Sequence, residues 1–142
     1  MSRLVHLPER AGTLYPGQFE VTEFVFEAFK KNPSWTDRTD IVCSLLRAAV
    51  FPQATDRDTS RYEPFIAASE VMTGLHKVEG AYNASNVTFH SVGGRDMIVG
   101  LLIHSNREPI AHIGHAAGLP LWSNGGDIII TWDRGPTKIF RI

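Results

Sequence analysis

The most informative segment of this chain reads Leu121-Trp-Ser-Asn-Gly-Gly-Asp-Ile-Ile-Ile-Thr-Trp-Asp-Arg-Gly-Pro-Thr-Lys-Ile-Phe-Arg-Ile142. Asn124-Gly125-Gly126 favours a chain reversal, because these residue types tolerate positive φ. A strand is predicted after it. One face of this strand carries Ile128, Ile130 and Trp132 and is more apolar than the other. Asp133-Arg-Gly-Pro136 interrupts the run, so the sequence predicts that residues 138–142 return antiparallel to residues 127–132.

Strand-like runs recur along the rest of the chain at intervals of roughly ten residues, with glycine-rich turns between them. They are predicted at residues 40–50, 74–78, 86–92, 97–104, 109–115, 127–132 and 138–142. The run at 40–50 is nearly continuous in apolar residues, so periodicity leaves a buried strand and a short buried helix both open. The overall pattern predicts a mainly β fold, an antiparallel β-sandwich or barrel-like domain.

Two helices are predicted beside these strands. Between Gln18 and Lys31 an apolar stripe recurs at helical spacing, and Asn32-Pro33 ends it. Its members are Val21, Phe24, Val25, Ala28 and Phe29, whereas Phe26 falls off the stripe. Ser60 and Glu63 have the spacing of a capping box, which predicts a short second helix through Ala68. One N-terminal packing helix and one short helix are therefore expected.

Residues 1–17 form a separate segment, and residues 18–142 form a single β-rich domain. The first segment has four Pro and Gly residues and no clear periodicity, although Leu4, Val5 and Leu7 are apolar. It is interpreted either as a disordered terminus or as an arm that orders against a neighbouring subunit. In the second case, Leu4, Val5 and Leu7 are the candidate anchors.

Composition excludes several classes of protein. A chain of 142 residues can bury a core without metals or disulfides. Its net charge of −1 gives no electrostatic footprint for nucleic acid or an anionic membrane. Cys43 is the single cysteine and lies in an apolar run, so it is expected to be a small buried hydrophobe. With no signal peptide and no apolar span of roughly 20 residues, synthesis in the cytoplasm is expected.

The residues that could carry chemistry form no catalytic or metal-binding motif. His104, His112 and His115 are the nearest to a metal-ligand set, with Asp96 or Asp127 as partners, but the spacing fits no common zinc pattern. Ser44 and Cys43 are nominal nucleophiles outside any nucleophile-elbow context. Gly93-Gly94-Arg95-Asp96 lacks phosphate-loop spacing and is interpreted as a β-turn. We expect no enzyme activity, no catalytic residue, no metal and no cofactor.

The three tryptophans are candidates for binding a partner. Trp132 falls on the apolar face of the 127–132 strand and is predicted to be core. Trp122 precedes Asn124-Gly125 in a predicted loop and is the best candidate for exposure, with Trp35 after Pro33-Ser34 as the other. An exposed indole can anchor a protein interface or stack on a sugar, so the two uses stay open.

The C-terminal half of the chain resembles a family of small virion proteins of tailed bacteriophages. The resemblance rests on Pro109-Ile-Ala-His-Ile113, Gly118-Leu-Pro120, Asn124-Gly-Gly-Asp127, Trp132-Asp133 and Ile139-Phe-Arg-Ile142. It is close over residues 109–142 and weaker, but in order, from about residue 21. It departs at Gly114-His115-Ala116, where the family carries an Asp-Thr-Gly-like turn, and the first seventeen residues have no counterpart.

This resemblance implies a virion structural protein and favours a strand at residues 40–50. A capsid decoration or cement subunit, acting through protein–protein contacts, is the favoured role; a minor tail, neck or baseplate component is the alternative. A carbohydrate- or surface-binding β-sandwich module is a more distant one. The expected partners are other virion proteins and further copies of the same chain, with no nucleic acid and no membrane. Leu4, Val5, Leu7 and Trp122 are the candidate partner-binding residues.

Overall fold

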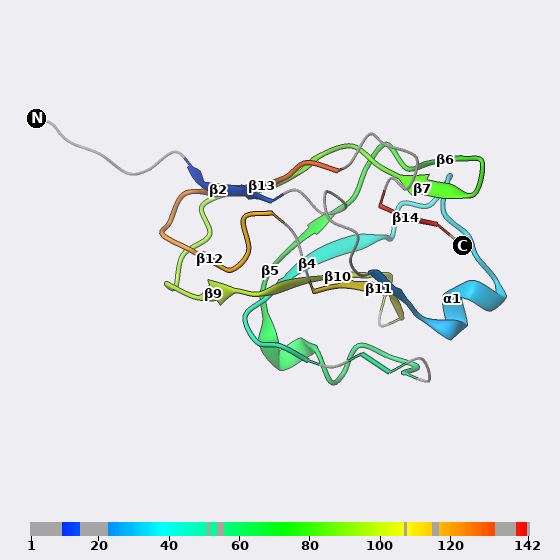
Figure 1. Ribbon diagram of the computed structural model, residues 1–142, viewed down its shortest axis with the longest axis horizontal. Helices are drawn as coiled ribbons and strands as arrows, with labels where there is room; N and C mark the ends of the chain where they lie inside the picture. Colours follow the sequence, from blue (N-terminus) through cyan, green and yellow to red (C-terminus); the bar gives the residue numbers. More distant parts are fainter. Residues whose placement is uncertain are drawn as a thin grey trace, which may run out of the picture.

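The structure, a computed structural model, describes residues 10–14, 23–50, 52–53, 56–106, 108–114, 117–132 and 139–141. It is mainly β, with short sheets that are antiparallel except for one strand pair and with very little helix, as the sequence predicts (Figure 1). None of the sheets closes on itself into a barrel within these residues. No helix among them is long and apolar enough to cross a bilayer.

The largest sheet has five strands, all antiparallel, in the order β3-β11-β10-β4-β5. These strands are Glu23–Val25 (β3), Pro109–Ile113 (β11), Gly100–His104 (β10), Val42–Leu46 (β4) and Ile66–Val71 (β5). The apolar run at 40–50 therefore contains a strand rather than a buried helix. Strand β4 lies between β10 and β5, and its last four residues are buried, so both of its faces are apolar and no polar alternation occurs there.

Three smaller sheets complete the architecture (Figure 1). The first has the order β2-β13-β8, the second β14-β7-β6 and the third β12-β9. Their strands are Arg10–Leu14 (β2), Asp127–Ile130 (β13), Val87–Phe89 (β8), Phe140–Arg141 (β14), Ala81–Asn83 (β7), His76–Val78 (β6), Leu121–Trp122 (β12) and Met97–Ile98 (β9).

The predicted C-terminal hairpin is wrong. Strand β13 pairs with β8 antiparallel and with β2 in parallel, whereas β14 pairs with β7 in another sheet. Both neighbours of β13 are distant in sequence, and β14 is not one of them. The strand itself and its apolar face are confirmed, because Ile128, Ile130 and Trp132 are all buried.

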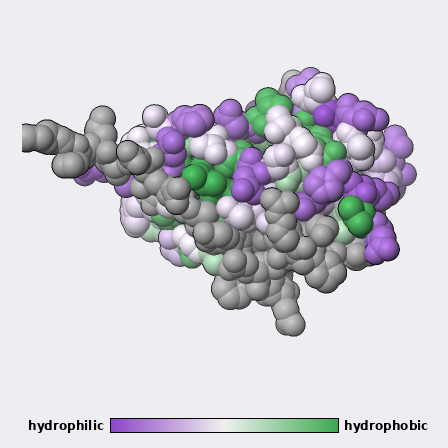
Figure 2. Space-filling model, turned by 90° about the horizontal axis from the view of Figure 1, so that it is seen from above, coloured by the Kyte–Doolittle hydropathy of each residue, from purple (hydrophilic) through white to green (hydrophobic). Residues whose placement is uncertain are grey.

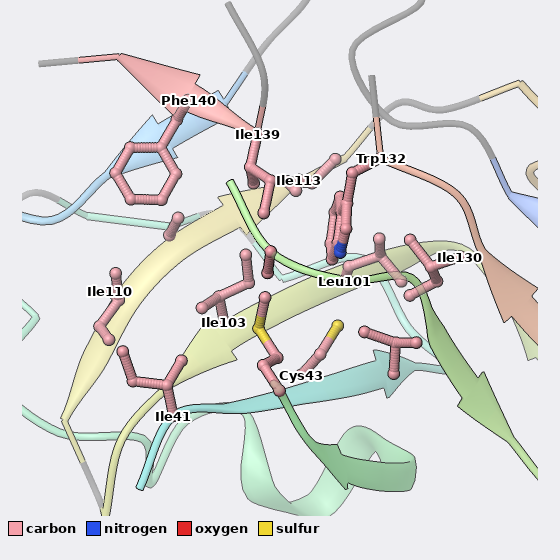
Figure 3. Packing of buried hydrophobic residues seen from close by; sticks show 14 of the residues in the cluster. Ile41, Cys43, Leu101, Ile103, Ile110, Ile113, Ile130, Trp132, Ile139 and Phe140 are labelled. Atoms are coloured by element: carbon pink, nitrogen blue, oxygen red, sulfur yellow. The ribbon is translucent and has the colours of Figure 1, made fainter. Parts of the chain in front are cut away.

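One hydrophobic cluster joins the five-stranded sheet to the smaller sheets. Leu101, Ile103 and Cys43 on one face of the large sheet point toward Trp132, Ile130 and Ile139, which come from the C-terminal region (Figure 3). Beside them an aromatic group packs edge to face, with one stacked pair; its members are Phe29, Trp35, Tyr82 and Phe140. Cys43 is fully buried in this cluster, as predicted.

The other face of the large sheet is partly covered by the segment that leads into β5. A second small cluster of Phe26, Leu46, Tyr62 and Leu102 lies there. Asp56 holds this segment: it accepts hydrogen bonds from the Tyr62 hydroxyl at 2.7 Å and from the Arg61 guanidinium at 2.7 and 2.8 Å. The large sheet is thus buried on one face and only partly covered on the other.

Both predicted helices are much shorter than expected. Glu23–Val25 forms strand β3 on the edge of the large sheet, and of the residues described in this region only Glu27–Lys31 is helical (α1). Phe26, which the helical stripe excludes, is fully buried, and Ala28, which the stripe includes, is exposed. The capping-box helix at residues 60–68 is also wrong, because only Glu63–Phe65 forms a 3-10 turn (η1) before β5 begins.

Part of the predicted N-terminal arm belongs to the folded domain. Leu4, Val5 and Leu7 lie outside the described residues. Arg10–Leu14, within the same predicted segment, forms β2 in parallel with β13. The Leu14 side chain is 0 % exposed in the main core, and its carbonyl accepts a hydrogen bond from the Thr131 N–H at 2.9 Å.

Candidate partner-binding site at Trp122

The Trp122 indole is the most exposed of the large hydrophobic side chains that the structure describes, at 59 %. It lies in the two-residue strand β12, opposite Met97 of β9. Its neighbour Leu121 points to the other side, where it packs on the main core and lies against Gly12 of β2. Alternation along this strand therefore directs Leu121 inward and Trp122 outward.

Trp122 forms one wall of a pocket of about 600 Å³. The rest of the wall comes from two turns, and its residues are Gly93, Gly94, Arg95, Ser123, Asn124 and Gly125. On the face seen from above, the coloured residues are a mixture of hydrophilic and hydrophobic types (Figure 2). A concave site with an exposed indole is the type of surface that takes up a partner's apolar side chain.

Hydrogen bonds lock the two turns together. The buried Ser123 hydroxyl donates to the Gly93 carbonyl at 2.9 Å and accepts from the Asp96 N–H at 2.7 Å. The Ser123 N–H donates to the Asp96 carbonyl at 2.8 Å, and the Gly125 N–H donates to the Val92 carbonyl at 2.8 Å. The pocket is therefore preorganised, which lowers the entropy lost when a partner binds.

Two of the pocket glycines leave space that a side chain could fill. A Cβ added at Gly93 or at Gly125 meets no heavy atom within 4 Å. Gly125 has φ +88°, so its backbone favours glycine. Gly93 is not in the left-handed region. Neither the backbone nor the packing therefore requires glycine at position 93, and its missing side chain leaves the pocket open.

Arg95 gives the pocket a positive charge. Within the described part of the chain, no ion pair or hydrogen bond engages its guanidinium, although the neighbouring Asp96 lies 3.7 Å from Arg47. Arg95 has φ +51° in the predicted turn at Gly93–Asp96, which is confirmed as a turn. The site thus combines a flat apolar face with one available cation, a pair that suits an apolar segment bearing an acidic group.

Of the other tryptophans, one behaves as predicted and one does not. Trp132 is buried, and its Nε1 donates to the Ser85 carbonyl at 3.1 Å. Trp35 is only 3 % exposed, so the prediction of an exposed Trp35 is wrong. Its Nε1 donates to the Asn83 carbonyl at 2.9 Å, which satisfies the polar end of the indole inside the core.

A chain of hydrogen bonds crosses three strands on the partly covered face of the large sheet. His104 Nε2 lies 2.7 Å from Ser44 Oγ, which in turn lies 2.7 Å from Ser69 Oγ. His104 Nδ1 is 2.9 Å from the Ser105 carbonyl, so this nitrogen carries the proton and neutral Nε2 accepts from Ser44. Burial lowers the pKa of His104, which keeps the imidazole neutral.

This Ser44–His104 pair does not form a catalytic triad. Ser44 is fully buried, so its hydroxyl is closed to a substrate. A backbone carbonyl, and not a carboxylate, orients the imidazole. Cys43 is no better a nucleophile, since burial raises the pKa of its thiol and disfavours the thiolate.

The metal-site candidates are not brought together among the described residues. No group of three or more His, Cys, Asp or Glu side chains suited to a metal ion occurs there, and His115 lies outside them. Asp127 is instead engaged with His90 Nδ1 at 3.3 Å and with the Ser91 N–H at 2.9 Å. His112 is largely buried beside the Tyr62 ring, and this burial lowers its pKa to about 4.

Comparison with known proteins finds no relative of this chain. No protein-family model, no curated protein and no solved structure matches this chain.

Proposed function

We propose that this chain is a non-enzymatic structural protein of a tailed-bacteriophage virion, with capsid decoration or cementing as the favoured role. The observation that carries the proposal is the exposed Trp122 in its preorganised pocket, a surface fitted for a protein partner. The sequence resemblance over residues 109–142 supplies the virion context. We also propose that the sheets of this domain pack as a β-sandwich.

The proposed mechanism is repetition of a small contact. One pocket contributes only a modest affinity, but many copies arranged on a symmetric shell bind together by avidity. The expected partners are capsid subunits and further copies of the chain, which form a homo-oligomer in the particle. Leu4, Val5 and Leu7 are proposed as further contacts, and a virion location follows from the same role.

Two other uses of the same surface are kept as alternatives. A minor tail, neck or baseplate component fits the resemblance equally well and needs the same kind of contact. A carbohydrate- or surface-binding module is favoured by one observation, the flat indole of Trp122 beside Arg95. Titration of glycans followed by tryptophan fluorescence separates it, because a sugar that stacks on Trp122 changes the emission and a structural subunit gives no response.

The direct test is add-back to particles assembled without this chain. Purified wild-type protein should cosediment with heads, and Trp122→Ala should bind at least about tenfold more weakly, as expected for an aromatic anchor. Val71→Ser is the matched control, because Val71 is also exposed, at 52 %, and lies on β5 away from the pocket. Equal binding of the Trp122→Ala variant would remove the support that the pocket gives to the proposal.

A further inference from the structure

The N-terminal segment enters the fold at the end where the Trp122 pocket lies. Strand β2 runs parallel to β13, with Arg10 opposite Asp127, so the starts of both strands are at the same end of their sheet. Asp127 follows Gly125, a pocket residue, by two positions. Strands β2, β13, β12 and β9 also lie together at one side of the molecule (Figure 1). Residues 1–9 therefore join the domain next to this pocket.

The sequence of this segment complements the pocket. Residues 1–9 contain the apolar side chains of Met1, Leu4, Val5 and Leu7, which can fill a site with apolar walls. Among the charged side chains of this segment, Glu9 has a charge opposite to that of Arg95, whereas the more distant Arg3 has the same charge. Nine residues span at most roughly 30 Å, enough to reach a neighbouring molecule.

Geometry favours the pocket of a neighbour over that of the same molecule. Because Arg10 pairs with Asp127, two residues after the pocket residue Gly125, the anchors could enter the pocket of the same molecule only if the chain reversed just before β2. Proline favours extended backbone at the residue before it, here Leu7, and a segment that continues away from β2 in that conformation reaches a neighbour without any reversal.

We propose that residues 1–9 of one copy occupy the Trp122 pocket of a second copy, with Leu4, Val5 and Leu7 against the indole and Glu9 near Arg95. This inference rests on the proposed function, because it specifies the partner of the same site. The contact is heterologous: it joins two different surfaces and leaves one arm and one pocket open at the ends of a pair. Such a contact can continue around a ring or across a lattice.

Complementation between two variants tests this arrangement. Deletion of residues 1–9 removes the arm and keeps the pocket, whereas Gly93→Phe fills the pocket and keeps the arm. Phe at position 93 introduces no backbone strain, because Gly93 is not at positive φ and has open space beside it. Each variant alone should be monomeric by sedimentation velocity, and an equimolar mixture should form heterodimers. Wild type should associate with a dissociation constant at least about tenfold below that of either variant alone.

The controls separate the possible failures. Val71→Ser should associate like wild type, and Trp122→Ala should behave like Gly93→Phe. A wild-type protein that stays monomeric at high concentration overturns the inference, as does a mixture that forms no heterodimer. If the monomeric protein still binds heads in the add-back assay, only the arm contact is refuted and the proposed function stands. If the protein self-associates but does not bind particles, the proposed function is refuted and the arm contact stands.

Discussion

The boundary between arm and domain gives a quantitative prediction. From sequence alone, the whole of residues 1–17 would be expected to be dispensable for folding. The structure instead places Leu14 at 0 % exposure in the main core, with β2 paired to β13. Leu14→Ala should therefore lower the free energy of unfolding by roughly 2–5 kcal/mol, the usual cost of truncating a buried leucine. For a chain of this size, about 3 kcal/mol corresponds to a decrease of about 10 °C in Tm.

Deletion of residues 1–9 is the matched comparison, because it leaves β2 intact. This variant should unfold with a free energy within about 0.5 kcal/mol of wild type, the range typical of changes outside the packed structure. Both variants can be measured by urea denaturation followed by tryptophan fluorescence, at a concentration where the protein is monomeric. If Leu14→Ala were as stable as wild type, the pairing of β2 with β13 would be refuted. A large loss on deletion of 1–9 would show that this segment belongs to the domain and is not an arm.

Three further predictions concern the core, the effect of pH and the chemistry. Trp132→Ala should cost roughly 3–5 kcal/mol in urea denaturation, and a cost near zero would mean that the apolar face of β13 points outward. Between pH 6.5 and about 4, a histidine in the unfolded chain binds a proton that buried His112 does not, so the free energy of unfolding should decrease as the pH is lowered through this range. His112→Leu should make this decrease smaller, and an unchanged pH dependence in the variant would contradict the prediction. A fluorophosphonate probe should leave Ser44 and Ser69 unlabelled by mass spectrometry, whereas stoichiometric labelling of either serine would contradict the non-enzymatic proposal.

Local patterns predicted individual strands well and their partners poorly. Alternation in residues 127–132 identifies the buried face of β13 correctly, because a two-residue period depends only on the strand itself. Its pairing with β2 and β8 depends on residues far away in sequence, and no turn motif encodes it. The Asp133–Pro136 motif therefore suggested a hairpin, although β14 pairs with β7 in another sheet.

The two incorrect helix predictions have the same cause. Val25 and Phe29 fit a helical stripe, but Phe26 between them is buried too, because β3 pairs with β11 and the chain turns into α1 immediately afterwards. Ser60 and Glu63 have capping-box spacing, yet Ile66–Val71 pairs with β4 and stops the helix at η1. In both places pairing with a distant strand overrides the local helical preference.

Of the candidate binding site, the sequence indicated only the central residue. Trp122 could be identified because it precedes a turn outside any apolar strand face, and its exposure is confirmed. Gly93 and Arg95 were interpreted as a turn, but their place beside Trp122 depends on the short β9–β12 pairing. Trp35 looks equally exposed in sequence, yet Tyr82 and Phe140 cover it.

Quantitative mass spectrometry of purified virions, with heads and tails separated, tests the proposed function most directly. We predict that this chain is present in the head fraction in high copy number, on the order of hundreds per particle, as repeated shell symmetry requires. A small fixed number of copies in the tail fraction would support the tail or baseplate alternative instead. Absence of the chain from both fractions would contradict the central claim that it is a structural component of the virion.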